Sequence, residues 1–232
     1  MGENTNRRKV ILFDFDGTLV NTTPLILRSF RATWEKTFGF TMDDAVYIKT
    51  FGTHLPAAMK QLAEQCVTEN RVAPIDDLEA KAAELLKTYR EINWGWHDQH
   101  IEAFEGVGEA VRELKARNYR LGIVSSKIRF GVERGLNLFS MAEPFDHIIA
   151  ADDVANHKPH PEPILKALEH FGASPHEAIY IGDSTHDIVA GKAARVATVA
   201  AAWGPFPRTE LEALKPDHLL DEPGELLRLF QK

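Results

Sequence analysis

Short apolar segments of strand length, accompanied by segments of helical pattern, constrain the fold of this chain more than any other feature. A segment that is apolar at nearly every position, rather than at every second one, is typical of a parallel strand buried on both faces. Five such segments are present, at 9–13, 120–124, 147–150, 178–181 and 197–200. Helical patterns accompany them at 107–117, 130–139, 161–171 and 185–194. We therefore expect an α/β fold with a Rossmann-like parallel sheet covered by helices on both faces.

The region from about residue 23 to residue 93 has a different character, because it contains only helical patterns. Apolar residues recur there at spacings of three and four in the segments 25–38, 55–66 and 77–92. A block of this size is too large for a simple crossover between two strands. It predicts a small helical lobe inserted after the first strand, with joints near 19–22 and 93–106.

Composition excludes some classes of partner. The chain has 232 residues, which suits one large domain or one domain with an inserted lobe, and its net charge of −7 argues against nucleic acid. No apolar segment is long enough to cross a bilayer, so a membrane is not expected as a partner. The single cysteine, Cys66, cannot form an internal disulfide, which favours a cytoplasmic location. The sequence leaves open whether the protein is a monomer or a homodimer.

Acidic residues gather at the predicted carboxyl ends of two strands. Asp14 and Asp16 end the first strand, and residues two apart on an extended chain point the same way. Asp183 closely follows the strand at 178–181, and Asp187 lies four residues further on, at the start of a helix. Ligands of open parallel sheets bind beyond the carboxyl ends of the strands. These four acids therefore mark the expected site.

A hydroxyl and an ammonium join these acids. Ser125 directly follows the strand at 120–124, and Lys158 precedes the helix at 161–171. Several neighbouring carboxylates need a cation, and hard oxygen ligands suit Mg²⁺ together with a substrate phosphate. An ionised carboxylate can attack phosphorus without a base, and a second acid can transfer protons. The hydroxyl and the ammonium can hold the phosphoryl oxygens.

These motifs, in this order, resemble the four motifs of the haloacid dehalogenase superfamily of phosphatases. The matching segments are Asp-Phe-Asp-Gly-Thr-Leu-Val at 14–20, Ser125, Lys158 and Gly182–Asp187, and the resemblance covers the whole chain. It implies a catalytic core made of residues 1–20 and 105–232. Residues 21–104 would then form a small α-helical cap of the C1 type.

The resemblance also implies a role for each site residue. Asp14 would be the nucleophile and Asp16 the general acid and base, with Ser125 and Lys158 as further catalytic residues. Mg²⁺ would be held by the side chains of Asp14 and Asp183 and by the backbone carbonyl of Asp16. The supporting residues would be Asp187, Gly182 and Ser126.

A closer resemblance concerns the substrate. The segments 122–127, 151–154 and 158–163 are similar to the phosphoglycolate phosphatase branch and, within it, to bacterial cytoplasmic pyrophosphatases. This implies a small phosphorylated substrate, either inorganic pyrophosphate or phosphoglycolate. In related caps, a loop placed like the one before His54 reaches the leaving group, so His54 and Lys49 are candidate substrate contacts.

Several alternative interpretations remain. Asp16-Gly17 could be an ordinary turn, and Asp187 could be an acid that stabilises a helix N-terminus. Trp94, Trp96 and His97, at the second joint, are expected to pack in a hinge. A phosphomutase of the β-phosphoglucomutase type would share the first half-reaction, and a signalling domain could accept a phosphoryl group on aspartate without catalysis. The chain lacks the glycine-rich motif of dinucleotide-binding folds.

Overall fold

The computed structural model describes residues 9–230, which divide into two compact units. One unit contains residues 9–21 and 102–230, and the other is Thr22–Ile101. The sequence-based boundaries, after residues 20 and 104, lie close to these limits. That the first unit is the catalytic core and the second a cap stays a prediction.

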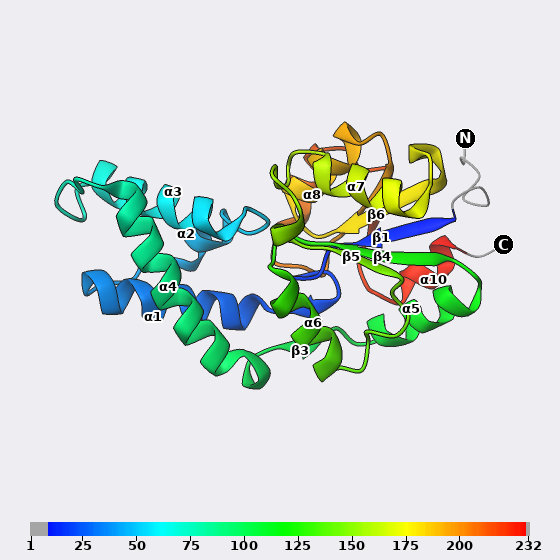
Figure 1. Ribbon diagram of the computed structural model, residues 1–232, viewed down its shortest axis with the longest axis horizontal. Coiled ribbons are helices and arrows are strands. Elements are labelled where there is room, and N and C mark those ends of the chain that lie inside the picture. Colours follow the sequence, from blue (N-terminus) through cyan, green and yellow to red (C-terminus); the bar gives the residue numbers. More distant parts are fainter. Residues whose placement is uncertain (1–8, 231–232) are drawn as a thin grey trace. The chain divides into compact units, whose positions relative to one another are not determined.

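Within the described part of the first unit, six parallel strands form one sheet in the order β5-β4-β1-β6-β7-β8 (Figure 1). The strands are β1 (Val10–Phe13), β4 (Arg120–Val124), β5 (His147–Ile149), β6 (Ala178–Gly182), β7 (Ala197–Ala201) and β8 (His218–Leu220). Every residue of β1 and of β6 is buried, as expected for strands covered on both faces. The predicted parallel α/β fold is thus confirmed. The sixth strand, β8, was not predicted.

The position of β1 determines where the first unit can bind a ligand. Phe13, at the end of β1, lies beside Ile123 of β4 on one side and Ile181 of β6 on the other. From β1 the chain crosses first to β4 and later to β6, so the strand order reverses beside β1. The loops that follow β1, β4 and β6 leave the sheet at the same edge, which is where open α/β sheets bind ligands.

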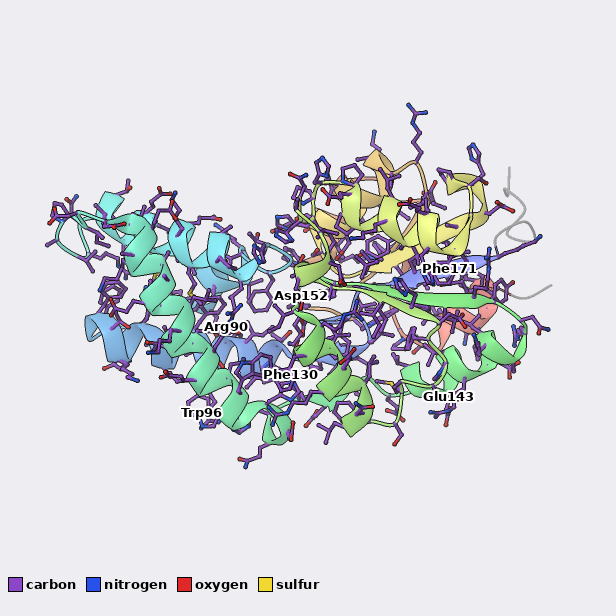
Figure 2. The ribbon with its side chains drawn as sticks, viewed as in Figure 1. Arg90, Trp96, Phe130, Glu143, Asp152 and Phe171 are labelled. Atoms are coloured by element: carbon purple, nitrogen blue, oxygen red, sulfur yellow. The ribbon has the colours of Figure 1, made fainter. Side chains whose placement is uncertain are left out.

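Helices cover both faces of this sheet; in Figure 1, α7 and α8 lie on one face and α5 and α10 on the other. The helices are α5 (Val107–Ala116), α6 (Arg129–Leu138), α7 (Glu162–Phe171), α8 (Thr185–Ala193), α9 (Arg208–Ala213) and α10 (Glu225–Leu229). Phe171, labelled in Figure 2, ends α7, and its ring packs so closely on β4 that a Cβ at Gly122 would lie 2.8 Å from it. No helix among residues 9–230 is long and apolar enough to cross a membrane.

The second unit is helical and has its own core. Its helices are α1 (Thr23–Phe38), α2 (Asp44–Ile48), α3 (Leu55–Thr68) and α4 (Leu78–Trp96), and both α1 and α3 pack on α4. Phe30 stacks on Tyr47 with ring centroids 5.1 Å apart. Cys66 is buried in α3, where its sulfur accepts a hydrogen bond from the Trp34 indole. The inserted helical lobe expected from the sequence is therefore present.

The chain passes between the two units inside the segments 19–22 and 93–106, where the joints were expected. The short strands β2 (Val20–Asn21) and β3 (Glu102–Ala103) pair in antiparallel fashion, so the chain enters and leaves through neighbouring segments. Helix α4 extends to Trp96, beyond the end predicted at Ile92. Trp96 is therefore the last residue of a helix, and its ring centroid lies 5.2 Å from the Arg28 guanidinium carbon.

Candidate active site

Three buried carboxylates meet at the ligand-binding edge of the sheet. Asp14 directly follows β1, Asp183 directly follows β6, and Asp187 lies in the first turn of α8. One oxygen atom from each lies within 4.8 Å of the oxygens offered by the other two. The parallel register of β1 and β6 brings Asp14 and Asp183 together, although 169 positions separate them (183 − 14 = 169).

Lys158 supplies a positive charge to this cluster. Its ammonium nitrogen lies 3.0 Å from an oxygen of Asp14 and 2.7 Å from an oxygen of Asp187. The hydroxyl of Tyr180 lies 2.9 Å from the same nitrogen, and the carbonyl of Val124 lies 3.5 Å from it. Burial lowers the pKa of Lys158, but the two aspartates outweigh burial and hold its pKa above the ordinary value. The lysine is therefore charged.

The acids of the cluster are not electrostatically equivalent. Burial raises the pKa of Asp14 to about 7; Lys158 opposes this shift, and the charges of Asp187 and Asp16 add to it. The pKa of Asp183 is also raised, first by burial and then by Asp187 and Asp14. For Asp187, burial is opposed by Lys158 and by hydrogen bonds that together lower the pKa. Asp187 is thus the acid that stays ionised, whereas burial and the neighbouring negative charges favour the protonated forms of Asp14 and Asp183 when no cation is bound.

The cluster fits a divalent cation. With all three carboxyls ionised, the single ammonium leaves two uncompensated negative charges (−3 + 1 = −2), which a divalent cation would neutralise. Four donors surround the oxygens of Asp187: Lys158 at 2.7 Å, Tyr180 at 2.8 Å, and the Ser184 hydroxyl and N–H at 2.6 and 3.0 Å. These donors match the four lone pairs of a carboxylate. Asp14 and Asp183 are therefore the side chains that could hold Mg²⁺, and Asp187 is suited to orienting Lys158.

Glycines provide the space around these carboxylates. Gly17 has a φ of +77°, and a Cβ there or at Gly204 would overlap the carboxylate of Asp183. A Cβ at Gly182, the last residue of β6, would overlap Asp187. A methyl group at any of these positions would displace a carboxylate of the cluster, so the site depends on three glycines from three segments.

Asp16 has different surroundings from Asp14. One of its oxygens lies 2.8 Å from the ammonium of Lys127, and a quarter of its side chain is exposed. Ser125 is buried; its N–H donates to the carbonyl of Ile149, and its hydroxyl oxygen accepts the N–H of Lys127 at 3.2 Å. Ser126 follows and is partly buried. The two acids of the first motif therefore have separate partners: Asp14 meets Lys158, and Asp16 meets Lys127.

Three residues of this site were missed by sequence reasoning. The hydroxyl of Thr18 donates to Asp183 at 2.9 Å, and Tyr180 and Lys127 make the contacts described above. Thr18 belongs to the first motif, so its position next to the acids in the sequence could have identified it as a site residue. Tyr180 lies in an apolar strand where it reads as a core residue, and nothing in the sequence pairs Lys127 with Asp16.

The predicted substrate contacts lie in the second unit. Lys49 follows α2 and His54 precedes α3. Their contact with a substrate stays a prediction, as does the binding of a metal ion by the Asp16 carbonyl. The rings of Trp94 and His97 lie 5.8 Å apart, so these residues pack on each other.

The parallel sheet, whose strand order reverses beside β1, carries a cluster of acids at its ligand-binding edge. Comparison with known families shows which class of hydrolase has this architecture. Residues 11–201 match the model of the haloacid dehalogenase-like hydrolase family, and the chain belongs to this family. The expected resemblance and the expected hydrolase are thereby confirmed.

Individual proteins of known sequence or structure are also similar to this chain. The chain is 41% identical to pyrophosphatase PpaX of Bacillus cereus over 230 residues, with 97% of each chain covered. Among solved structures, it matches a phosphoglycolate phosphatase candidate from Lactobacillus plantarum with a TM-score of 0.80 and 30% identity, covering 96% of this chain and 99% of that one. A haloacid dehalogenase-like hydrolase candidate from Bacteroides fragilis matches with a TM-score of 0.83 and 28% identity, covering 94% and 99%.

Proposed function

We propose that this protein is a Mg²⁺-dependent phosphohydrolase that works through an aspartyl-phosphate on Asp14, with inorganic pyrophosphate as the leading substrate and phosphoglycolate as the second. The observation that carries the proposal is the position of Asp14. It is buried at the ligand-binding edge of the sheet, 3.0 Å from Lys158 and in the same cluster as Asp183. This arrangement presents a carboxylate as a nucleophile beside positive charge.

In the first half-reaction, an oxygen of Asp14 attacks phosphorus. The bond between phosphorus and the leaving oxygen breaks, its electron pair stays on that oxygen, and Asp16 supplies a proton. The Ser125 hydroxyl and Lys158 bind the phosphoryl oxygens. A Mg²⁺ ion held by Asp14 and Asp183 would supply the charge that keeps Asp14 ionised and reduces its repulsion from the phosphoryl group.

In the second half-reaction, water attacks the phosphorus atom of the aspartyl-phosphate. Asp16 accepts the proton of that water, and phosphate leaves while the Asp14 carboxylate is restored. The separate partners of the two acids support this division of roles, since Lys158 contacts Asp14 and Lys127 contacts Asp16.

The substrate class is proposed from the relatives. The identity of 41% to pyrophosphatase PpaX over nearly the full length supports pyrophosphate. The similarity to the phosphoglycolate phosphatase candidate supports phosphoglycolate. Both substrates are small, and neither requires a protein or nucleic acid partner.

Steady-state kinetics test this function directly. Pyrophosphate, phosphoglycolate, sugar phosphates and nucleotides are compared with excess Mg²⁺ and with EDTA. We expect kcat/KM for pyrophosphate to exceed that for sugar phosphates by roughly 100-fold, which corresponds to about 2.7 kcal/mol of transition-state binding. Activity that EDTA leaves unchanged, or transfer of phosphate to a sugar instead of water, would contradict the proposal.

Binding of Mg²⁺ also predicts a stability effect that depends on pH. Without metal, the raised pKa of Asp14, about 7 against 3.8, makes the folded state bind more protons, so stability falls as pH rises between these values. Mg²⁺ competes with those protons and should stabilise more at pH 8 than at pH 5. At about 100 times its dissociation constant, we expect Tm to rise by about 5–10 °C at pH 8.

The control for this experiment is Asp14→Asn, which should lose most of the increment. Equal increments at the two pH values, or the same increment in the variant, would argue against Mg²⁺ binding at this cluster. Differential scanning calorimetry in matched buffers measures both.

A further inference from the structure

Lys127 is a charged residue of the first unit that the mechanism so far uses only as a partner of Asp16. It lies in the loop between β4 and α6, and its ammonium nitrogen is 2.8 Å from Asp16. Its side chain is only 12% exposed, and the ring centroid of Phe15 lies 5.7 Å from the ammonium. The ammonium of Lys127 thus lies next to the predicted proton donor, Asp16. The other lysine of the site, Lys158, lies next to the predicted nucleophile, Asp14.

The backbone at Lys127 is held from both sides. Its N–H donates to the Ser125 hydroxyl at 3.2 Å, and its carbonyl accepts the N–H of Ala151 at 2.9 Å. Two residues on, the N–H of Arg129 donates to Asp152, which Figure 2 labels near the start of α6. These contacts hold the loop that carries Lys127, and its ammonium is placed beside Asp16.

We propose that Lys127 is a specificity-determining residue that binds a negatively charged group on the leaving part of the substrate. The inference rests on the proposed function, because it takes Asp16 as the group that protonates the leaving oxygen. Whatever carries that oxygen must come within hydrogen-bonding distance of Asp16, and so close to the ammonium of Lys127. An ammonium has three donors, and the contact with Asp16 uses one of them.

The first half-reaction shows which negatively charged group the ammonium of Lys127 would bind. When the bond between phosphorus and the leaving oxygen breaks, the electron pair stays on that oxygen and the proton of Asp16 neutralises it. A further charge remains on the leaving group if the substrate is an anhydride or ester of an anion. The second phosphoryl group of pyrophosphate and the carboxylate of phosphoglycolate are such charges, whereas a neutral sugar or alcohol has none.

Two substrates separate this role from simple positioning of Asp16. Orthophosphate and p-nitrophenolate are leaving groups of closely similar basicity, so pyrophosphate and p-nitrophenyl phosphate make similar demands on the proton donor. Only the leaving orthophosphate carries charge beyond its leaving oxygen. A residue that merely orients Asp16 would affect both substrates equally, while one that binds the leaving group would affect pyrophosphate more.

The experiment measures kcat/KM for both substrates with wild-type protein, Lys127→Met and Lys127→Arg. For Lys127→Met we expect roughly a 50-fold loss with pyrophosphate and about a 3-fold loss with p-nitrophenyl phosphate, so the selectivity ratio falls more than 10-fold. Lys127→Arg, which keeps the charge, should retain the ratio within about 3-fold. The ratio does not depend on the fraction of folded enzyme, and Lys166→Met, at an exposed lysine of α7, is the matched control.

An unchanged ratio in Lys127→Met would overturn the inference, whether both activities fall together or neither falls. That outcome would leave the proposed function intact, since wild-type protein would still hydrolyse both substrates. Failure of the wild-type protein to hydrolyse pyrophosphate, phosphoglycolate and p-nitrophenyl phosphate would instead reject the proposed function. If phosphoglycolate is the preferred substrate, it is compared with its carboxamide, which differs only in charge.

Discussion

Replacing Asp14 by asparagine is expected to lower kcat for pyrophosphate hydrolysis by at least about 10⁴-fold, with the fold intact. Asparagine has nearly the same shape but no anionic oxygen to attack phosphorus, and loss of a nucleophile typically has an effect of this size or larger. The loss corresponds to about 5.4 kcal/mol of transition-state stabilisation. This loss of kcat is measured as phosphate released in samples quenched at fixed times, with excess Mg²⁺ present.

Stability separates this chemical effect from unfolding. Asp14 is buried beside Asp183 and Asp187, and its pKa is raised because burial and the charges of Asp187 and Asp16 disfavour the ionised form. An uncharged amide removes that repulsion, so the metal-free variant should unfold at the wild-type temperature or above it. Asp76→Asn, at an exposed aspartate between α3 and α4, controls for the amide itself. Activity within about 10-fold of wild type would remove Asp14 from the nucleophile role.

Replacing Lys158 by methionine should impair both activity and stability. The ammonium is buried between Asp14 and Asp187, and removing one partner of a buried ion pair costs about 3–5 kcal/mol. We expect a loss of stability of that size in urea unfolding with EDTA present. The same change removes a phosphoryl-binding donor, so kcat/KM should fall by about 10³-fold.

The matched control for this variant is Lys87→Met, at an exposed lysine of α4. It should leave stability within about 0.5 kcal/mol of wild type, as is usual for surface substitutions. A Lys158→Met protein as stable as that control would contradict a buried ammonium. A protein destabilised but still fully active would contradict its role in binding phosphoryl oxygens.

The strands of the sheet could be predicted because burial on both faces leaves a continuous apolar signal. β1 and β6 show this most clearly, since every residue in each is buried. β8 gives no such signal, because its three residues lie between Asp217 and Asp221. The other edge strand, β5, is equally short, but its apolar run continues into Ala150 and Ala151. The two-residue strands β2 and β3 are too short to produce any pattern, because their pairing depends on how the chain joins two units.

The acids of the site could be predicted from topology. Parallel strands end at one edge, so residues directly after β1 and β6 must meet there, and Asp14 and Asp183 do. The pairing of Asp16 with Lys127 could not be predicted, because it depends on the path of a loop held by Ser125 and Asp152. Side-chain pairing across loops requires coordinates.

Asp187 illustrates a role that the sequence left open between two interpretations. It does accept the N–H of Ser184 in a capping box at the start of α8. Its other oxygen contacts Lys158 and Tyr180, so the same carboxylate also fixes the lysine of the site. Asp187 therefore caps the helix and supports Lys158 at the same time. Its contact with Tyr180 could not be predicted, because a tyrosine in an apolar strand is expected to be a core residue.

The most direct test of the aspartyl-phosphate is to trap it on the chain. Enzyme is mixed with excess substrate and Mg²⁺, quenched with acid at intervals through a single turnover, and reduced with borohydride, which converts an aspartyl-phosphate into homoserine. Peptide mass spectrometry then locates the modified residue. The mechanism predicts homoserine at position 14 and nowhere else. Homoserine at Asp183 or Asp187, or complete consumption of substrate with no modified aspartate at any time point, would contradict it.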